Sequence, residues 1–165
     1  MHQKYIYVII PAFDEEQSIA KVIEAIPKQN VAEIIVVNNN SKDNTVMVAQ
    51  NAGATVLNEF EQGYGAACLK GIAYVNNKSK LPKNTIIAFL DGDFSDYPEE
   101  LPNVVAPILN QDIDMVIGSR RLGKAEKGSL TPQQVFGNWL ATILISIRLK
   151  FKYTDIGPMR AITLD

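Results

Sequence analysis

Short hydrophobic runs rich in Val and Ile alternate along the chain with segments whose apolar residues recur at helical spacing. The runs predict strands, and the periodic segments predict a helix in each interval between them. This regular alternation predicts an α/β fold, with a Rossmann-like, mostly parallel, twisted sheet and helices on both of its faces. The expected strands cover residues 5–10, 33–37, 55–57, 85–90 and 115–117, and the expected helices about 18–26, 43–52, 65–75 and 98–108.

The ends of the first two helices carry residues with strong positional preferences. Ser18 and Asp43 are expected to cap them, because a side-chain oxygen can accept a hydrogen bond from the amides of a first turn. Pro27 and Gly53 are expected to end them. The strand at 85–90 is apolar on both faces, as a central strand covered by helices on each side must be.

The composition narrows the class of protein. The 165 residues fit one domain spanning 1–165, and 47% hydrophobic with 21% charged residues is typical of soluble globular proteins. The net charge of -2 gives no overall attraction to nucleic acid, so no nucleic-acid partner is expected. Cys68 is the single cysteine, which excludes an internal disulfide and suits a reducing compartment. The run at 5–13 contains Pro11 and suits a strand better than a signal peptide, so we expect a cytoplasmic protein.

Polar loops follow four of the predicted strands, at residues 11–16, 38–41, 91–96 and 118–121. The carboxyl ends of parallel strands meet at one edge of a sheet, and ligands of such folds bind outside that edge. The sequence therefore predicts that the functional site lies where these loops converge.

Asp91 and Asp93 are the strongest candidates for chemistry in these loops. Two carboxylates separated by one residue in an extended segment point to the same side and repel each other. A hard cation relieves that repulsion, and Mg²⁺ typically takes one or two carboxylates together with phosphate oxygens and water. Gly92 between them would let a ligand approach the backbone closely. The alternative is a solvated acidic turn before the helix at Pro98, but the preceding buried strand favours a metal-diphosphate site.

Five segments in order along the chain carry a family resemblance. They read VIIPAFDEE at 8–16, IVVNNNSKDNT at 35–45, DGD at 91–93, GSR at 118–120 and DIGPMR at 155–160. Together they resemble the family 2 glycosyltransferases with the GT-A fold, and within them the branch of dolichyl-phosphate mannose and glucose synthases. The resemblance implies transfer of a hexose from a UDP- or GDP-sugar, with inversion, to an acceptor that we expect to be a polyprenyl phosphate.

The resemblance also implies roles for individual residues. Asp91 and Asp93 would hold Mg²⁺ or Mn²⁺, and Asp93 and Arg120 would act in catalysis, with Arg120 at the phosphates. The side chains suit these roles. The aromatic ring of Phe13 can border a base, the carboxylate of Glu15 can accept hydrogen bonds from ribose hydroxyls, and the guanidinium of Arg120 can bind two phosphate oxygens at once. In isolation these residues also fit structural roles, such as a strand-ending proline or a helix-capping glutamate. The nucleotide-sugar would be bound by Pro11, Ala12, Phe13, Glu15, Asn38 and Gly92.

Three features depart from the family pattern. Asn38 and Asn39 stand where the family usually has two acidic residues, the first of which pairs with the base, so the identity of the base stays open. Ser95 stands where close relatives carry a glutamine, so water can replace a third protein ligand of the metal. The sequence ends at Asp165, soon after the last matching segment, so we expect either a truncated chain or a minimal enzyme.

The segment 133–151 bears on the acceptor. It forms an apolar helical pattern around Trp139 with a basic end from Arg148 onward, which suits a helix at a membrane interface or a helix packed in the core. An interfacial helix would place the enzyme at the inner face of the membrane, with a lipid-phosphate acceptor. A phosphate monoester is mostly ionised near neutral pH and needs no general base. For a hydroxyl acceptor, Asp155 and Asp96 are the candidate bases.

Two other functions compete with glycosyl transfer, and the pattern predicts no oligomeric state. A phosphohydrolase of the haloacid dehalogenase type also carries a D-x-D motif after an apolar strand. That class places the motif at its first strand, usually followed by Gly and Thr, whereas Phe94 and Ser95 follow it here after a fourth strand. A non-catalytic module that binds nucleotide-sugars is the second alternative, and turnover would distinguish it from an enzyme.

Overall fold

The computed structural model describes residues 5–111, 113–119, 157 and 159–164. Residues 1–116 and 159–165 form one compact unit, which contains every helix and strand below except the last residue of β5. The second unit is 117–158, of which residues 117–119 and 157 are described. Within it a Cβ added at Gly157 would lie 2.1 Å from the carbonyl oxygen of Gly118, so no side chain fits there. Both glycines belong to segments that carry the family resemblance.

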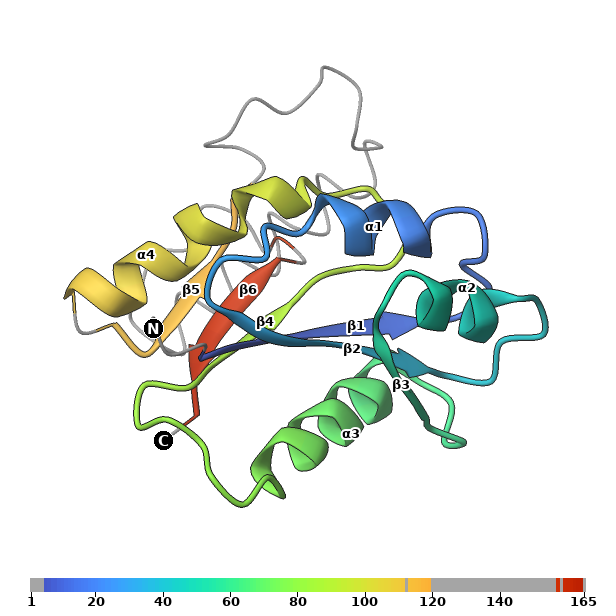
Figure 1. Cartoon of the computed structure of the whole chain (residues 1–165), viewed down its shortest axis with the longest axis horizontal. Coiled ribbons are helices and arrows are strands. Elements are labelled where there is room, and N and C mark those ends of the chain that lie inside the picture. The colour runs from blue at the N-terminus through green and yellow to red at the C-terminus, as the bar shows by residue number, and fades with distance from the viewer. Residues whose placement is uncertain (1–4, 112, 120–156, 158, 165) are drawn as a thin grey trace, which may run out of the picture. The chain divides into compact units, whose positions relative to one another are not determined.

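The sheet has the strand order β3-β2-β1-β4-β6-β5 and is mostly parallel, as the sequence predicts (Figure 1). β1 pairs in parallel with β2 and β4, and β2 pairs in parallel with β3. All five predicted strands are present, with boundaries shifted by a few residues. The bounds are β1 Ile6–Ala12, β2 Val31–Asn38, β3 Thr55–Asn58, β4 Ile86–Phe89, β5 Met115–Ile117 and β6 Arg160–Thr163.

β6 is a strand that the hydrophobic pattern does not predict. It runs antiparallel to β4, with Phe89 opposite Arg160 and Ala88 opposite Ala161, and it separates β4 from β5. Its four residues include Arg and Thr, so the run is too short and too polar to stand out from a loop. Its stability comes from pairing with a strand about 70 residues earlier in the chain, which local sequence does not encode.

The helices fill the intervals predicted for them. They are α1 Ile19–Ala25, α2 Thr45–Asn51, α3 Tyr64–Asn76 and α4 Leu101–Gln111, the last preceded by the 3-10 turn η1 Pro98–Glu100. Ser18 is the N-cap residue of α1, but its hydroxyl donates to Glu15 rather than accepting from the helix. Asn44, not Asp43, is the N-cap of α2, although Asp43 accepts from the amide of Thr45.

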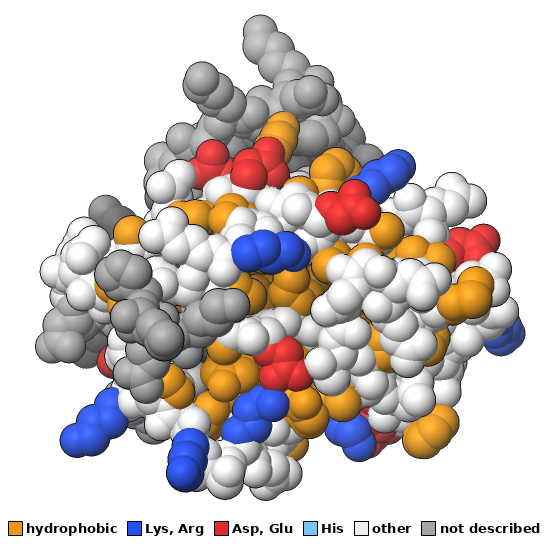
Figure 2. Space-filling model, viewed as in Figure 1, with side chains coloured by type: hydrophobic (Ala, Val, Ile, Leu, Met, Phe, Trp, Pro, Cys, Tyr) orange, Lys and Arg blue, Asp and Glu red, His pale blue; other side chains and the backbone are white. Residues whose placement is uncertain are grey.

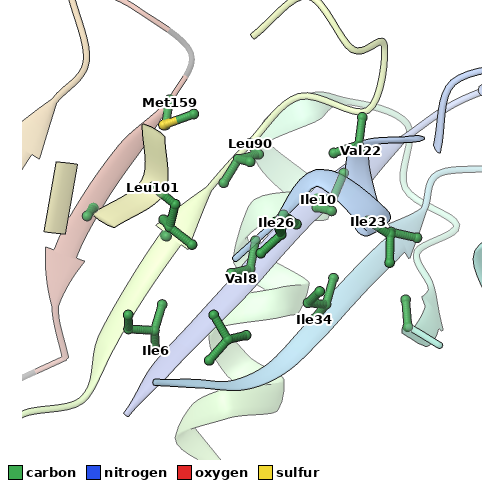
Figure 3. Packing of buried hydrophobic residues seen from close by; sticks show 14 of the residues in the cluster. Ile6, Val8, Ile10, Val22, Ile23, Ile26, Ile34, Leu90, Leu101 and Met159 are labelled. Carbon is green, nitrogen blue, oxygen red and sulfur yellow. The ribbon is translucent and has the colours of Figure 1, made fainter. Parts of the chain in front are cut away.

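Helices cover both faces of the sheet, with α1 and α4 on one side and α3 on the other (Figure 1). Successive residues of a strand point to opposite faces, so Val8 and Ile10 pack toward α1 while Tyr7 and Ile9 pack toward α3. Both clusters are apolar throughout, as expected for a sheet covered on each side. Figure 3 shows the first cluster, in which the strand residues Val8, Ile10 and Ile34, with Leu90 just after β4, pack against Val22, Ile23, Ile26 and Leu101.

The surface of the described residues carries charges of both signs. Acidic and basic side chains are interspersed over the face seen in Figure 2. Among the described residues, no helix combines the length and the apolar character that crossing a bilayer requires.

Candidate active site

The ends of β1 and β4 form a pocket at the edge where the sequence predicts a site. Ala12 at the end of β1 lies opposite Asn38 at the end of β2, and Ile9 lies opposite Phe89 at the end of β4. The three loops that follow these parallel strands therefore start side by side. Together with the first turn of α3, they line a pocket of about 260 Å³, whose lining residues are Pro11, Ala12, Phe13, Glu15, Asn39, Tyr64, Ala67, Asp91, Gly92 and Asp93.

The two aspartates of the D-x-D motif lie in this pocket with Glu15. Asp93 accepts a hydrogen bond at Oδ1 from the amide of Ser95 at 2.9 Å, which closes a tight turn through Phe94, whose φ is +60°. Gly92 is buried, and a Cβ there would lie 3.4 Å from both the Glu15 side chain and the carbonyl oxygen of Pro11. The motif therefore packs on the end of β1, and a Cβ at this position would just reach van der Waals contact with it.

The carboxylates fit a divalent cation that is shared with a ligand. Among the described residues there is no group of three or more His, Cys, Asp or Glu side chains arranged to hold a metal ion by themselves. Two carboxylates that leave the remaining positions to phosphate oxygens and water are the usual arrangement for Mg²⁺ in nucleotide sites. Asp91 and Asp93 therefore suit a metal that binds together with a diphosphate.

A network of hydrogen bonds fixes the loop that carries Glu15. Its amide donates to Thr45 Oγ1 at 2.7 Å, and its carboxylate accepts from Ser18 Oγ at 2.6 Å. Thr45 is fully buried and donates in turn to Asp43. Burial would raise the pKa of the Asp43 carboxyl, but hydrogen bonds from Thr45 and from the amide of Glu16 outweigh it and lower that pKa. The first turn of α2 thus holds the loop after β1 in one conformation.

Three successive asparagines hold the loop between β3 and α3. Asn39 Nδ2 donates to the carbonyl oxygens of Glu59 and Glu61 at 3.0 and 2.7 Å, while its Oδ1 accepts from the amide of Gly63 at 2.8 Å. Asn40 Nδ2 donates to the carbonyl oxygen of Phe60 at 2.9 Å. Because the partners of Asn39 are backbone groups, they fix which end of its amide is oxygen and which is nitrogen. We call Asn38, Asn39 and Asn40 the asparagine latch.

Asn38 is not among the residues that line the pocket, although the sequence predicts that it contacts the nucleotide. Its Nδ2 donates to Asn58 Oδ1 at 2.9 Å, and its Oδ1 accepts from the amide of Ser41 at 3.1 Å. Asn39, its neighbour, is the asparagine that lines the pocket. A contact between Asn38 and a base stays a prediction.

Tyr64 and Ala67 line the pocket but were missed by sequence reasoning, which considered only the loops that follow strands. Both lie in the first turn of α3, three residues apart and hence on one side of the helix. Arg160 Nη2 donates to Tyr64 Oη at 3.4 Å, and the guanidinium carbon lies 5.8 Å from the centre of the ring. Burial, with the nearby charge of Asp91, raises the pKa of the Tyr64 hydroxyl.

Three predicted features lie outside the described residues: Arg120, Asp155 and the segment 133–151. Asp96 is described and does not line the pocket. The structure thus brings together Pro11, Ala12, Phe13, Glu15, Asp91, Gly92 and Asp93 from the predicted set.

Comparison with known proteins identifies the family to which this site belongs. Residues 7–162 match the sequence profile of "Glycosyl transferase family 2". The chain belongs to this family. Family membership and the position of Asp91 after β4, rather than after the first strand, argue against a haloacid dehalogenase-type phosphohydrolase.

Two relatives named as glycosyltransferases agree with the assignment. An uncharacterized glycosyltransferase of Mycobacterium bovis is 35% identical over 160 residues, which covers 93% of this chain and 65% of the relative. A UDP-N-acetylglucosamine--dolichyl-phosphate N-acetylglucosaminyltransferase of Methanococcus voltae is 28% identical over 156 residues, covering 84% of this chain and 61% of the relative.

The fold of this family 2 member matches solved structures. Glucosyl-3-phosphoglycerate synthase from Mycobacterium tuberculosis, in complex with Mn²⁺, UDP and phosphoglyceric acid, superposes with a TM-score of 0.73 at 23% identity. The match covers 97% of this chain and 56% of that structure and establishes the GT-A fold. The chain therefore spans between about half and two thirds of the length of these relatives, from 56% to 65%.

Proposed function

We propose that this chain transfers a hexose from a UDP- or GDP-sugar to a polyprenyl phosphate, with inversion at the anomeric carbon. One observation carries the proposal: Glu15, Asp91 and Asp93 share a pocket with the exposed ring of Phe13 at the carboxyl edge of a parallel sheet. An aromatic rim beside a cluster of carboxylates suits a ligand that has a base at one end and a metal-bound diphosphate at the other. Membership of glycosyltransferase family 2 supports the reaction class.

The donor would lie along the loop after β1. Phe13 is 50% exposed, so its ring is available to border a nucleobase. Glu15 is held by Thr45 and Ser18 in a position to accept hydrogen bonds from ribose hydroxyls. Pro11, Ala12 and Gly92 form the buried floor beneath the donor. We assign recognition of the base to the end of β2, where Asn39 lines the pocket and Asn38 bonds to its neighbours.

Asp91 and Asp93 would hold Mg²⁺ or Mn²⁺. When bound, the cation supplies positive charge that stabilises the diphosphate as it leaves the sugar. The Mn²⁺ and UDP in the structure of the mycobacterial synthase support this part of the proposal. Within the chain, the turn closed by Asp93 and Ser95 fixes the backbone of the motif, so the two carboxylates need little reorganisation when the donor binds.

The acceptor is proposed to be a lipid phosphate at the cytoplasmic face of the membrane. The dolichyl-phosphate transferase among the relatives supports this choice, and the phosphoglyceric acid bound by the mycobacterial synthase is also a phosphate-bearing molecule. An ionised phosphate monoester can attack the anomeric carbon without a general base. Arg120 would bind phosphate oxygens. Asp155 or Asp96 would serve as the base only for a hydroxyl acceptor.

Metal-dependent donor binding tests the proposal directly. Without metal, we expect UDP or GDP to raise the melting temperature only slightly. With Mn²⁺, and with the nucleotide at about one hundred times its Kd, we expect a rise of about 5–10 °C. Asp93→Asn should remove the metal-dependent part, because it deletes a charged ligand of the cation. Asp114→Asn changes an exposed aspartate that does not line the pocket and should leave the shift intact. Equal shifts for wild type and Asp93→Asn would take Asp93 out of the site.

Turnover separates an enzyme from a binding module. Radiolabelled UDP- and GDP-sugars would be incubated with a short-chain polyprenyl phosphate and, in parallel, with phosphoglyceric acid. Label in the lipid fraction that depends on Mn²⁺ and is absent with Asp93→Asn would support the proposal. Label only in the soluble acceptor would refute the lipid part. Donor binding without transfer to either acceptor would favour the non-catalytic module.

A further inference from the structure

The pocket is acidic, although the ligand proposed for it is an anion. Glu15, Asp91 and Asp93 line it, and no Lys or Arg is among its lining residues in the described part of the chain. The diphosphate and these carboxylates are all negatively charged, and a single divalent cation neutralises only part of their combined charge. Hydrogen-bond donors that face the phosphates are therefore needed in addition to the cation.

Arg160 comes close to this pocket through the pairing of β6. Since β6 is antiparallel to β4, its first residue, Arg160, lies opposite Phe89, the last residue of β4. Asp91 follows only two residues later. A short strand late in the sequence thus brings a guanidinium to the carboxyl edge of the parallel strands.

The guanidinium reaches the pocket through Tyr64. Arg160 Nη2 donates to Tyr64 Oη at 3.4 Å and lies over the face of its ring. A hydroxyl that accepts such a bond is polarised, so it becomes a stronger donor of its own proton. Tyr64 is 44% exposed and lines the pocket, so this proton can be donated to a ligand.

The position of Tyr64 is fixed from its other side by the asparagine latch. Gly63, the residue before it, is the N-cap of α3 and donates its amide to Asn39 Oδ1 at 2.8 Å. Asn39 therefore sets where α3 begins, and with it where the ring of Tyr64 stands. The loop after β2 acts through Gly63 and β6 acts through Arg160, so both help to place Tyr64, which lies in α3 rather than in a loop after a parallel strand.

We propose that the Tyr64 hydroxyl donates a hydrogen bond to a phosphate oxygen of the nucleoside diphosphate, with Arg160 as the residue that positions and polarises it. The inference rests on the proposed function, since it takes the pocket to be the donor site. It adds a binding residue from α3 and a positioning residue from β6 to the loops predicted from the sequence.

Calorimetric titration of the full chain with UDP and GDP, in the presence of Mn²⁺, tests the role of Tyr64. Tyr64→Phe keeps the ring and removes only the hydroxyl, and we expect it to weaken binding of the diphosphate about ten-fold or more. Binding of uridine and guanosine, followed by NMR titration, should not change, because these nucleosides lack phosphate. Tyr97→Phe is the matched control, since Tyr97 is exposed and does not line the pocket.

The outcomes separate this inference from the function on which it rests. If Tyr64→Phe binds the diphosphate as tightly as wild type does, the inference is wrong but the proposed function still stands. An equal loss of nucleoside and diphosphate binding would overturn the phosphate contact in favour of one to base or ribose. Failure of wild type to bind either diphosphate would overturn the inference and the proposed function together.

A double-mutant cycle tests the positioning role of Arg160. Arg160→Gln should weaken diphosphate binding several-fold in wild type and have little further effect in Tyr64→Phe, because its contribution passes through the hydroxyl. A general structural defect would instead lower affinity equally in both backgrounds. That additive result would overturn the role assigned to Arg160.

Discussion

At the scale of single residues, the side-chain amide nitrogen of Asn39 holds the loop after β3 in place, which an oxygen at the same position could not do. Asn39 is 8% exposed, and its amide nitrogen donates both of its protons to backbone carbonyls of the loop after β3. An aspartate of the same shape would present an oxygen to those two carbonyls. The sequence marks this position as a departure from the family pattern but does not explain it, because the partners are backbone groups about 20 residues away.

We therefore predict that Asn39→Asp, which restores a family-typical acidic residue, destabilises this chain by about 3 kcal/mol at pH 7. The reason is repulsion between a buried carboxylate and the carbonyl oxygens of Glu59 and Glu61. Urea unfolding followed by circular dichroism measures the change. Asn40→Asp is the control, since Asn40 is less buried and its Nδ2 donates to the carbonyl oxygen of Phe60, so this substitution should destabilise the fold less. An Asn39→Asp variant as stable as wild type would contradict this account of the latch.

At the scale of elements, the periodic patterns predict α1 to α4 and five of the six strands in the described part of the chain, but they do not predict β6. The buried runs of β1, β2 and β4 stand out because both faces of the sheet are covered, so nearly every residue is apolar. β6 has four residues, as many as β4 but fewer than β1 or β2, and it includes Arg and Thr, so it gains its stability from pairing with β4. The same limit applies to the site: loops after strands could be located, but Tyr64 and Arg160 meet only through tertiary pairing.

The packing of α3 on β1 provides a prediction about Gly71. A Cβ at this buried helical position would lie 2.6 Å from Cγ2 of Ile9, which is itself fully buried. Alanine usually favours a helix over glycine by about 1 kcal/mol, but overpacking a core costs about 1–3 kcal/mol. We expect Gly71→Ala to lower the free energy of unfolding by up to about 2 kcal/mol.

Gly65 supplies the matched control within the same helix. A Cβ there would meet no atom within 4 Å, so Gly65→Ala should be neutral or stabilising. Thermal unfolding of both variants tests whether α3 lies as close to β1 as described. Equal stabilisation by the two substitutions would mean that the helix stands further from the sheet.

At the scale of the whole molecule, one ion pair ties three elements together. Glu33 on β2 accepts from Thr55 on β3 and from Tyr74 on α3, and forms a 2.8 Å salt bridge with Lys78. Burial opposes ionisation of Glu33, but the hydrogen bonds from Lys78, Thr55 and Tyr74 outweigh it and lower its pKa. The hydrogen bond that Lys78 donates to Glu33 raises the pKa of Lys78. Glu33 then stabilises the fold above its unfolded pKa near 4.5, and Lys78 stabilises it below its unfolded pKa near 10.5.

We predict that Glu33→Gln lowers stability by about 1 kcal/mol at pH 7, because the pair is partly exposed and screened by solvent. The difference from wild type should shrink as the pH falls below about 4.5 through the lowered pKa of Glu33. Urea unfolding between pH 3 and pH 7 measures it. Glu99→Gln, at an exposed position of η1, should show a much smaller difference. A Glu33→Gln effect that stays constant down to pH 3 would contradict a contribution from the charge.

The late position of β6 has a consequence for how the protein is made. During synthesis on the ribosome, β1 to β4 emerge well before residues 160–163, so the outer edge of β4 has no β6 to cover it in the meantime. Unpaired strand edges are templates for association between nascent chains. Arg160 can reach Tyr64 only when β6 docks on β4. Protection of the β4 edge against aggregation and completion of the acidic pocket would therefore be achieved in the same folding step, the docking of β6 on β4.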